Sequence, residues 1–533
     1  MSVIELTINN RAIRSDVAPR IHLGDFLRDN QNLTGGVAGT IIKSPQLFGL
    51  NIDAASHPAR YGFFVLICFV VVTLAVANIR RGRTGRRLIA VRTNERAAAA
   101  LGIGVRGVKL YAFGLSAGIA ALGGILIAFR STAVTYSSFT NFTSISDVGL
   151  SVVGGVGYLI GPVIGGTLSP GALDERIFDS ISTGIAKYVP LIGGISIILL
   201  VLLNQNGIAK EAIAQIGWVR GRIARRLRFL APRPRKPVSL PPVSGVEKVD
   251  PQTLEARDVT VRYGGTTAVD GVSLTVKPGI VVGLIGPNGA GKTTFIDAVT
   301  GFTRAAEGTL LLDGKEISRW SPVRRARAGL GRSFQSLELF EDSTVFDNLR
   351  AASDPRDLAS YARDLVYPFA PPLPGQVVSA IKEFQLEEDL DRLVEDLSYG
   401  KRRLLAIARA VATRPGILLL DEPAAGLGDI ESGELAHLVR RLASEWGMGI
   451  LLVEHDMNFV MSVCDEIVVL DFGRKISEGT PEQVRNDPAV IAAYLGEAEP
   501  LPAGSAAGVS VVSGDGPSPT SAGAAADKSE IPR

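Results

Sequence analysis

The chain contains very little of the chemistry that builds disulfide frameworks or metal clusters. It has two cysteines and four histidines among 533 residues. Cys68 and Cys464 lie in different regions, so they offer neither a disulfide framework nor a thiolate cluster. A reducing cytoplasm is the expected setting. Residues 1–30 lack an uninterrupted apolar core of signal-peptide length, so secretion is not expected.

Charged side chains are absent from four long stretches of the first half. Hydrophobic residues make up 46% of the chain. Three charge-free runs, over residues 61–79, 110–129 and 188–209, are each long enough to cross a bilayer as a helix. A fourth, over residues 148–173, is interrupted by glycines and prolines. The pattern predicts a multi-pass membrane region.

The basic residues indicate how this region is oriented. The loop over residues 80–109 holds nine arginines and lysines against one acid, Glu95, which places the loop in the cytoplasm. Residues 210–236 are also basic, so the last run must end in the cytoplasm. The second run therefore ends outside the cytoplasm, and the last run must start there. The chain between them must cross the membrane an even number of times. Residues 148–173 therefore form a hairpin, or residues 171–187 form a return leg.

The arginines and lysines cluster around the apolar runs and do not form a basic stripe of the kind that binds nucleic acid. Nucleic acid is therefore not an expected partner. A basic helix over residues 218–230 predicts contact with anionic membrane lipid. A proline-rich linker follows it.

The first 35 residues predict a strand through Ile8, a turn at Asn9 and Asn10, and a return strand. Residues 4–35 resemble the opening of the ferredoxin-like iron–sulfur subunits of xanthine and carbon monoxide dehydrogenases. That family continues into a loop of cluster-binding cysteines, whereas the first cysteine here is Cys68, inside an apolar run. We expect a remnant without a cluster.

The strongest motif is GPNGAGKTT, which follows an apolar strand and precedes a helix. Its glycines let backbone amides surround phosphates, and the helix N-terminus favours anions. Lys292 is expected to reach the β- and γ-phosphates, and the Thr293 hydroxyl to bind magnesium. The predicted ATP-binding residues here are Gly286, Pro287, Asn288, Gly289, Ala290, Gly291, Lys292, Thr293 and Thr294.

A second apolar strand ends in Asp421 and Glu422. Asp421 is placed to hold the magnesium shell, and Glu422 is placed to polarise the attacking water as general base.

Residues 397–410, LSYGKRRLLAIARA, lie between these motifs and resemble the signature of ABC ATPases. The resemblance implies that Ser398 and Gly400 face ATP held by a second ATPase domain in a head-to-tail dimer. It also implies that Tyr263 stacks on adenine and that Gln335 contacts magnesium and the attacking water. His455 would hydrogen-bond the γ-phosphate, so that Glu422, His455, Gln335 and Lys292 are the expected catalytic set.

The resemblance extends to one transporter family. RSFQSLELFEDSTVFDNL, PAAGLGDIESGEL and LLVEHDMNFVMSVCDEIVVLDFG resemble the ATPase of branched-chain amino acid importers, and VVGGVGYLIGPVIGG resembles their permease. That permease has about twice as many spans as this chain shows. Residues 95–102 are the expected docking element for the ATPase. Gly428 stands where many ABC proteins carry an aspartate that bridges the dimer, and Asp429 is an alternative bridge.

The sequence thus predicts a multidomain chain: an α-helical transmembrane permease region followed by an α/β P-loop ABC ATPase domain. The expected divisions are a ferredoxin-like remnant (1–35), a partial permease (36–215), a basic segment and linker (216–252), the ATPase (253–497) and a disordered tail (498–533).

The expected activity is ATP-driven import of branched-chain amino acids across the cytoplasmic membrane, with the ATPase in the cytoplasm. ATP and Mg²⁺ are the expected cofactors. A second ATPase domain, a partner permease, an extracytoplasmic solute-binding protein and lipid are the expected partners. The alternatives are import of urea or short amides, an ATPase that does not transport, an exporter and an iron–sulfur carrier.

Overall fold

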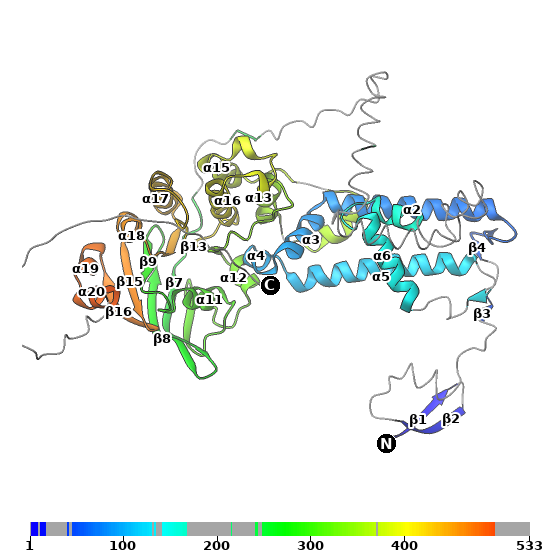
Figure 1. The fold of residues 1–533 in the computed structure, drawn as a ribbon, viewed down its shortest axis with the longest axis horizontal. Helices are drawn as coiled ribbons and strands as arrows, with labels where there is room; N and C mark the ends of the chain where they lie inside the picture. Colours follow the sequence, from blue (N-terminus) through cyan, green and yellow to red (C-terminus); the bar gives the residue numbers. More distant parts are fainter. Residues whose placement is uncertain are drawn as a thin grey trace, which may run out of the picture.

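The protein is described by a computed structural model, shown in Figure 1. It describes residues 2–8, 11–17, 40–41, 45–130, 133–134, 141–167, 215, 240–242, 248–355, 357–368 and 371–495. The expected span over residues 188–209, the basic helix over 218–230 and the tail from 498 lie outside the described residues.

The ATPase half is built on a six-stranded sheet whose strands are parallel except at one edge. The edge strand β16 pairs antiparallel with β15, and the other pairs are parallel. The inner strands are fully buried apolar runs, as parallel strands covered on both faces must be. The order is β12 (Leu330–Ser333), β13 (Ile417–Asp421), β14 (Gly449–Val453), β9 (Val281–Ile285), β15 (Glu466–Asp471) and β16 (Arg474–Gly479).

A second, antiparallel sheet covers the helix that follows β9. Its order is β11 (Lys315–Glu316), β10 (Glu307–Leu312), β7 (Leu254–Tyr263) and β8 (Thr266–Val276). Helix α11 (Lys292–Thr300) contacts β7 and β8. One hydrophobic cluster joins the two sheets and this helix, so the chain segments that carry the nucleotide motifs are held in one rigid core.

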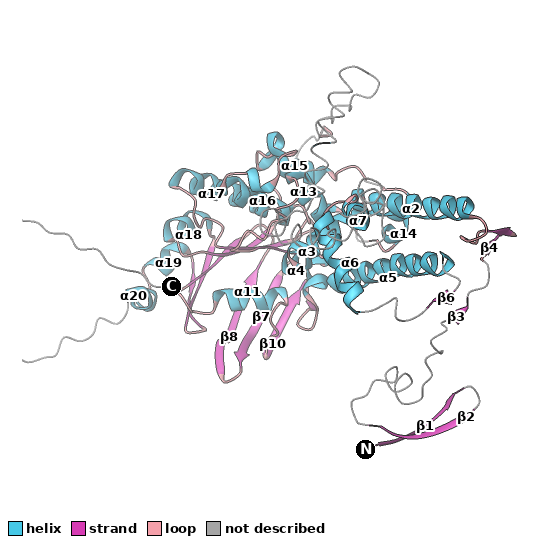
Figure 2. Cartoon of the chain, turned by 45° about the vertical axis from the view of Figure 1, so that its right-hand side comes forward, coloured by secondary structure: helices cyan, strands magenta, loops and turns pink. Residues whose placement is uncertain are grey.

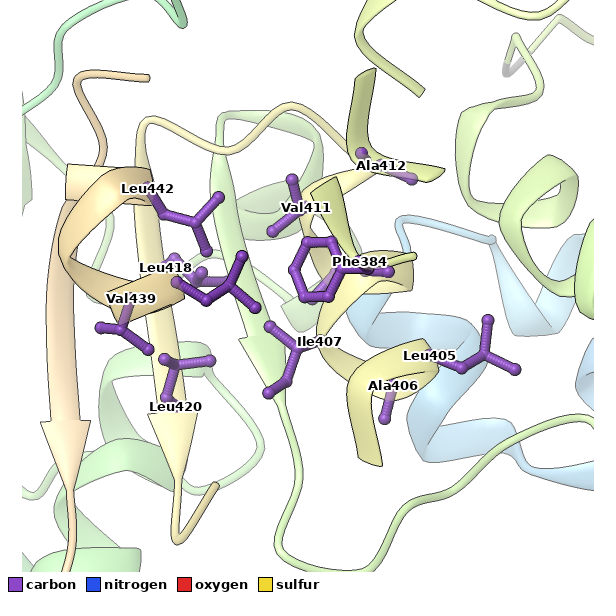
Figure 3. Close-up of a cluster of buried hydrophobic side chains, with 14 of the residues drawn as sticks. Phe384, Leu405, Ala406, Ile407, Val411, Ala412, Leu418, Leu420, Val439 and Leu442 are labelled. Atoms are coloured by element: carbon purple, nitrogen blue, oxygen red, sulfur yellow. The ribbon is translucent and has the colours of Figure 1, made fainter. Parts of the chain in front are cut away.

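Helices cover the remaining faces of the large sheet (Figure 2). Ile407 and Val411 of α16 gather with Leu418 of β13 and Val439 of α17 in a second hydrophobic cluster (Figure 3). The described helices of the ATPase half, not all of which touch this sheet, are α12 (Pro322–Arg327), α13 (Val345–Ser353), α14 (Ala359–Val366), α15 (Gly375–Glu383), α16 (Tyr399–Val411), α17 (Asp429–Ser444), α18 (Met457–Val463), α19 (Pro481–Arg485) and α20 (Pro488–Leu495), with 3-10 turns at Glu387–Asp389 and Val394–Asp396.

The first two apolar runs form long helices, α2 (Pro58–Arg81) and α5 (Val105–Arg130), as predicted. They lie side by side in Figures 1 and 2 and run in opposite directions, and the Tyr61 hydroxyl donates to the Leu126 carbonyl at their far ends. Both are long and apolar enough to cross a membrane. Helices α3 (Arg83–Thr93) and α4 (Glu95–Ala100) connect them on the side of the ATPase.

The glycine-rich run does not form one crossing. It breaks into α6 (Asn141–Gly154) and α7 (Gly161–Thr167), which pack against each other. A Cβ atom on Gly154 would lie 2.0 Å from the Gly161 carbonyl oxygen, so glycine is required at this contact. The break argues against a single crossing, which the parity argument also excluded; the alternative return leg over residues 171–187 lies outside the described residues.

The N-terminal strands β1 (Ser2–Ile8) and β2 (Arg11–Val17) pair as the predicted hairpin. Short pairs complete the described strands: β3 (Thr40–Ile41) with β6 (Ala133–Val134), and β4 (Gln46–Leu47) with β5 (Leu50–Asn51).

Candidate active site

The predicted phosphate loop connects β9 to α11. Lys292 is the first residue of α11, and its ammonium donates to the carbonyl oxygens of Gly286 at 2.8 Å and Pro287 at 2.9 Å. Burial lowers the pKa of Lys292, while the nearby carboxylates of Glu422 and Asp421 oppose that shift. The loop thus holds a buried cation where a helix N-terminus also favours an anion.

The loop needs glycine at its last turn. Gly291 has φ of 96°, and a Cβ atom there would lie 2.4 Å from the carbonyl oxygen of Ala268. A side chain at this position would both strain the backbone and displace β8. Thr293, one residue into the helix from Lys292, is exposed.

The carboxyl ends of β12, β13 and β14 bring three predicted catalytic residues together. The Gln335 amide nitrogen donates to a Glu422 carboxylate oxygen at 2.7 Å, and His455 Nδ1 lies 4.0 Å from the same oxygen. Glu422 has φ of 47°, and its backbone nitrogen donates to the Val453 carbonyl at 2.8 Å, which fixes the turn. Gln335 and His455 are exposed, so a ligand can reach all three.

Asp421 lies one residue earlier, at the end of β13, and is buried. One of its carboxylate oxygens pairs with Arg332 at 3.0 Å, and the other is buried without a hydrogen-bond partner among the described residues. Burial raises the pKa of Asp421, and the Arg332 guanidinium opposes that shift. An unpaired carboxylate oxygen beside the phosphate loop fits a hard cation such as Mg²⁺.

Tyr263 ends β7 with its side chain half exposed, and its hydroxyl lies 3.2 Å from the Thr303 hydroxyl. The ring is therefore open to a stacking ligand.

Three family models match the chain. The ABC transporter model covers residues 269–425, the model of the branched-chain amino acid transport system permease component covers 27–174, and the model of the branched-chain amino acid ATP-binding cassette transporter covers 474–500. The permease match begins inside the segment that the sequence assigned to a ferredoxin-like remnant.

Curated relatives match the ATPase half. The high-affinity branched-chain amino acid transport ATP-binding protein BraF of Pseudomonas aeruginosa is 43% identical over 253 residues, which are 46% of this chain and 98% of that protein. Its counterpart LivG of Escherichia coli is 40% identical over 250 residues, with the same coverage. A solved nucleotide-free ATP-binding cassette from an ABC transporter is 31% identical, with a TM-score of 0.41, covering 46% of this chain and all of that one.

The chain belongs to the ABC transporter family. It joins a permease region and an ABC ATPase in one polypeptide, and the ATPase hydrolyses ATP in a transport-coupled system.

The predicted signature residues Ser398 and Gly400 lie at the start of α16. Ser398 caps α16 by accepting a hydrogen bond from the Lys401 amide, and Gly400 lies in the first turn. With Lys401 and Glu431 they line a pocket between α16 and α17. None of the lining residues comes from the phosphate loop.

Arg403, which was not among the predicted site residues, holds two of the loops that carry them. It is 1% exposed and donates to the Gln335 carbonyl at 2.9 Å and the Ala425 carbonyl at 3.2 Å. It also donates to the Tyr399 hydroxyl, which in turn bonds the Ala425 carbonyl at 3.3 Å. Tyr399 thus helps tie α16 to the Gln335 loop and to the loop after Glu422.

Glu454, also missed, is completely buried beside His455. Its carboxylate accepts hydrogen bonds from the backbone nitrogens of Ala424 at 2.7 Å and His455 at 3.1 Å. Burial raises the pKa of Glu454, and these donors oppose the shift. An acid immediately before the predicted histidine was visible in the sequence, but its burial was not.

The expected docking element is confirmed: α4 packs on the ABC ATPase, against α12. Its N-cap Asn94 accepts from the Ala97 amide, and four consecutive alanines, residues 97–100, are buried. The Gly102 carbonyl accepts from Arg327 at 2.8 Å. The Arg96 guanidinium lies over the Phe334 ring at 5.3 Å, next to Gln335.

A chain of ion pairs continues from this contact to the buried carboxylate of the active site. Arg96 pairs with Asp297 of α11, Asp297 pairs with Arg332 of β12, and Arg332 pairs with Asp421. Arg332 is 2% exposed and is bracketed by both acids. This connection, hereafter the arginine–aspartate chain, links the permease region to the edge of the sheet that carries Asp421.

Proposed function

We propose that this chain imports branched-chain amino acids across the cytoplasmic membrane, with its permease region and ABC ATPase acting as one coupled unit. One observation carries the proposal: α4 of the permease region contacts Phe334, whose neighbour Gln335 hydrogen-bonds Glu422. The names of the relatives and of two family models support the substrate class. An extracytoplasmic binding protein, a partner permease and lipid complete the proposed system.

In this proposal Glu422 accepts a proton from the attacking water, and Gln335 and His455 orient that water and the γ-phosphate. Lys292 leaves its loop carbonyls to bind the β- and γ-phosphates, with the loop residues 286–294 cradling them and Tyr263 stacking on adenine. Mg²⁺ would be held by Thr293, Gln335 and Asp421 and would neutralise developing phosphate charge. Ser398 and Gly400 act on the nucleotide of a second ATPase domain.

The dimer requirement can be tested by mixing two inactive chains. Lys292→Ala removes the cation proposed to bind the phosphates of ATP. Gly400→Asp disrupts the proposed signature, because even a Cβ atom at this position would lie 2.8 Å from Glu431 Oε1. Each pure variant should be inactive. In a head-to-tail homodimer, random mixing should restore about a quarter of the wild-type sites, because half the dimers are mixed and each holds one intact site.

The measurement is ATP hydrolysis by the two purified full-length chains before and after mixing at equal concentration. Mixing each variant with itself is the control. No recovery, with each variant still pairing with wild-type chain, would mean that the nucleotide site does not draw its signature from a second copy.

The substrate class can be tested by transport. Proteoliposomes with the full chain and its partner subunits should accumulate labelled leucine when ATP is supplied, and should accumulate much less urea. The same preparation with Glu422→Gln is the control and should accumulate neither. If urea were accumulated in preference to leucine, the proposed substrate class would be wrong. ATP hydrolysis without uptake of leucine or urea would favour an ATPase that does not transport.

A further inference from the structure

Helix α14 of the ATPase has its polar side buried and its apolar side exposed. Ser360 and Asp364 are completely buried. Leu358, Val366 and Tyr367 are 83%, 81% and 67% exposed. The outer face consists of residues spaced so that they share one side of a helix: Leu358, Ala359, Ala362, Arg363, Val366 and Tyr367. This is the reverse of a helix that covers a soluble core.

The buried polar side of α14 is held by the permease region. The Thr84 backbone nitrogen donates to Asp364 at 2.8 Å, and the Arg87 guanidinium donates to the Ser360 hydroxyl at 2.9 Å. Arg87 also lies 5.2 Å from the centre of the Tyr361 ring. These contacts fix which side of α14 faces outward.

The position of α14 along the candidate spans is also fixed. The Asn78 amide, one turn before the end of α2, donates to the Val366 carbonyl at 2.8 Å. The Tyr111 hydroxyl, two residues after Lys109 on α5, donates to the Tyr361 carbonyl at 3.0 Å. Both contacts lie where the apolar runs give way to basic residues. That boundary is the level of the lipid headgroups in a spanning helix.

Exposed apolar side chains on the spans lie within about one helical turn of these two contacts. Leu74, Leu110 and Phe113 are 57%, 71% and 74% exposed. Exposed cations also lie at this level: Arg80 and Arg81 follow Asn78, and Arg363 lies on α14, where it pairs with Asp357. A surface that combines apolar residues, a tyrosine and arginines is better suited to the membrane interface than to bulk water.

We propose that the outer face of α14 lies in the headgroup region of the cytoplasmic leaflet, so that the ATPase itself contacts the membrane. The inference rests on the proposed membrane-spanning role of α2 and α5. Arginine side chains favour an anionic bilayer over the apolar flank of a second permease chain.

The test places a nitroxide on single cysteines of the full chain in nanodiscs of phosphatidylcholine and phosphatidylglycerol. Cys68→Ala removes one native thiol, and burial raises the pKa of Cys464 to about 12, so that thiol stays unlabelled. Labels at Val366→Cys, at Val71→Cys in α2 and at Phe472→Cys on the ATPase turn are compared, because all three side chains are exposed. The readout is the ratio of collisions with oxygen to collisions with a polar nickel chelate.

A headgroup position predicts a ratio at Val366→Cys that lies between a higher ratio at Val71→Cys and a lower ratio at Phe472→Cys. A ratio at residue 366 as low as that at residue 472, with a high ratio at residue 71, would show water and overturn the inference while leaving the span intact. Few collisions of either kind at residue 366 would show a protein cover and would also overturn it. A ratio below one at residue 71 would instead contradict the proposed span.

Discussion

Glu422→Gln should leave ATP binding intact and lower the hydrolysis rate by about 10²–10⁴-fold, the usual contribution of a general base. The change keeps the size of the side chain, and the amide oxygen can still accept the hydrogen bond that Gln335 donates at 2.7 Å. What is lost is the capacity to take a proton from water. The chain should therefore bind nucleotide with nearly unchanged affinity and fail to release phosphate.

The measurement pairs a phosphate-release assay with binding of a fluorescent ATP analogue by the full chain in detergent. Glu445→Gln is a matched control, since Glu445 is half exposed and its ion pair among the described residues is with Arg441, one helical turn away. Its hydrolysis rate should equal that of wild type. A Glu422→Gln chain that kept more than a tenth of its rate would require another base, and His455 would be the next candidate.

Much of the site could be predicted from the sequence because its parts lie at strand ends. The loops after β9, β13 and β14 carry Lys292, Glu422 and His455, and neighbouring parallel strands bring their carboxyl ends to one edge. The two apolar helices were equally clear, because a charge-free run of that length is rarely anything else. Fold class and family followed from these local patterns.

What could not be predicted depends on contacts between distant segments. Arg403 and Arg332 look like ordinary helix and strand arginines, and only the fold places one between two loop carbonyls and the other between two carboxylates. The inverted polarity of α14 was hidden for the same reason. Its polar side faces Thr84 and Arg87, which lie more than 250 residues earlier in the chain. Periodicity gives the two faces of a helix but not which face is covered.

Arg332→Met should be the most destabilising single change in the arginine–aspartate chain. It leaves Asp421, which is 2% exposed, without its cation, and breaking a buried ion pair in this way costs about 3–5 kcal/mol. For a domain of this size that corresponds to a fall of roughly 6–20 °C in the melting temperature. Arg96→Met removes only the partly exposed end of the chain, whose pair contributes about 1 kcal/mol or less.

Arg332→Lys tests whether the positive charge at this position is sufficient or whether the two-pronged geometry of the guanidinium is needed. One guanidinium nitrogen of Arg332 pairs with Asp297 and another with Asp421, a fork that a single ammonium group cannot reproduce. The lysine variant should therefore recover part of the lost melting temperature, yet need more Mg²⁺ than wild type for half-maximal hydrolysis, because the Asp421 carboxylate is no longer held in place. Arg96→Met should keep the wild-type Mg²⁺ requirement but lose stimulation by the transport substrate. If Arg332→Lys matched wild type in both measurements, the bridge between Asp297 and Asp421 would have no role beyond charge balance, and the permease region would have to signal to the site through Phe334 and Gln335 alone.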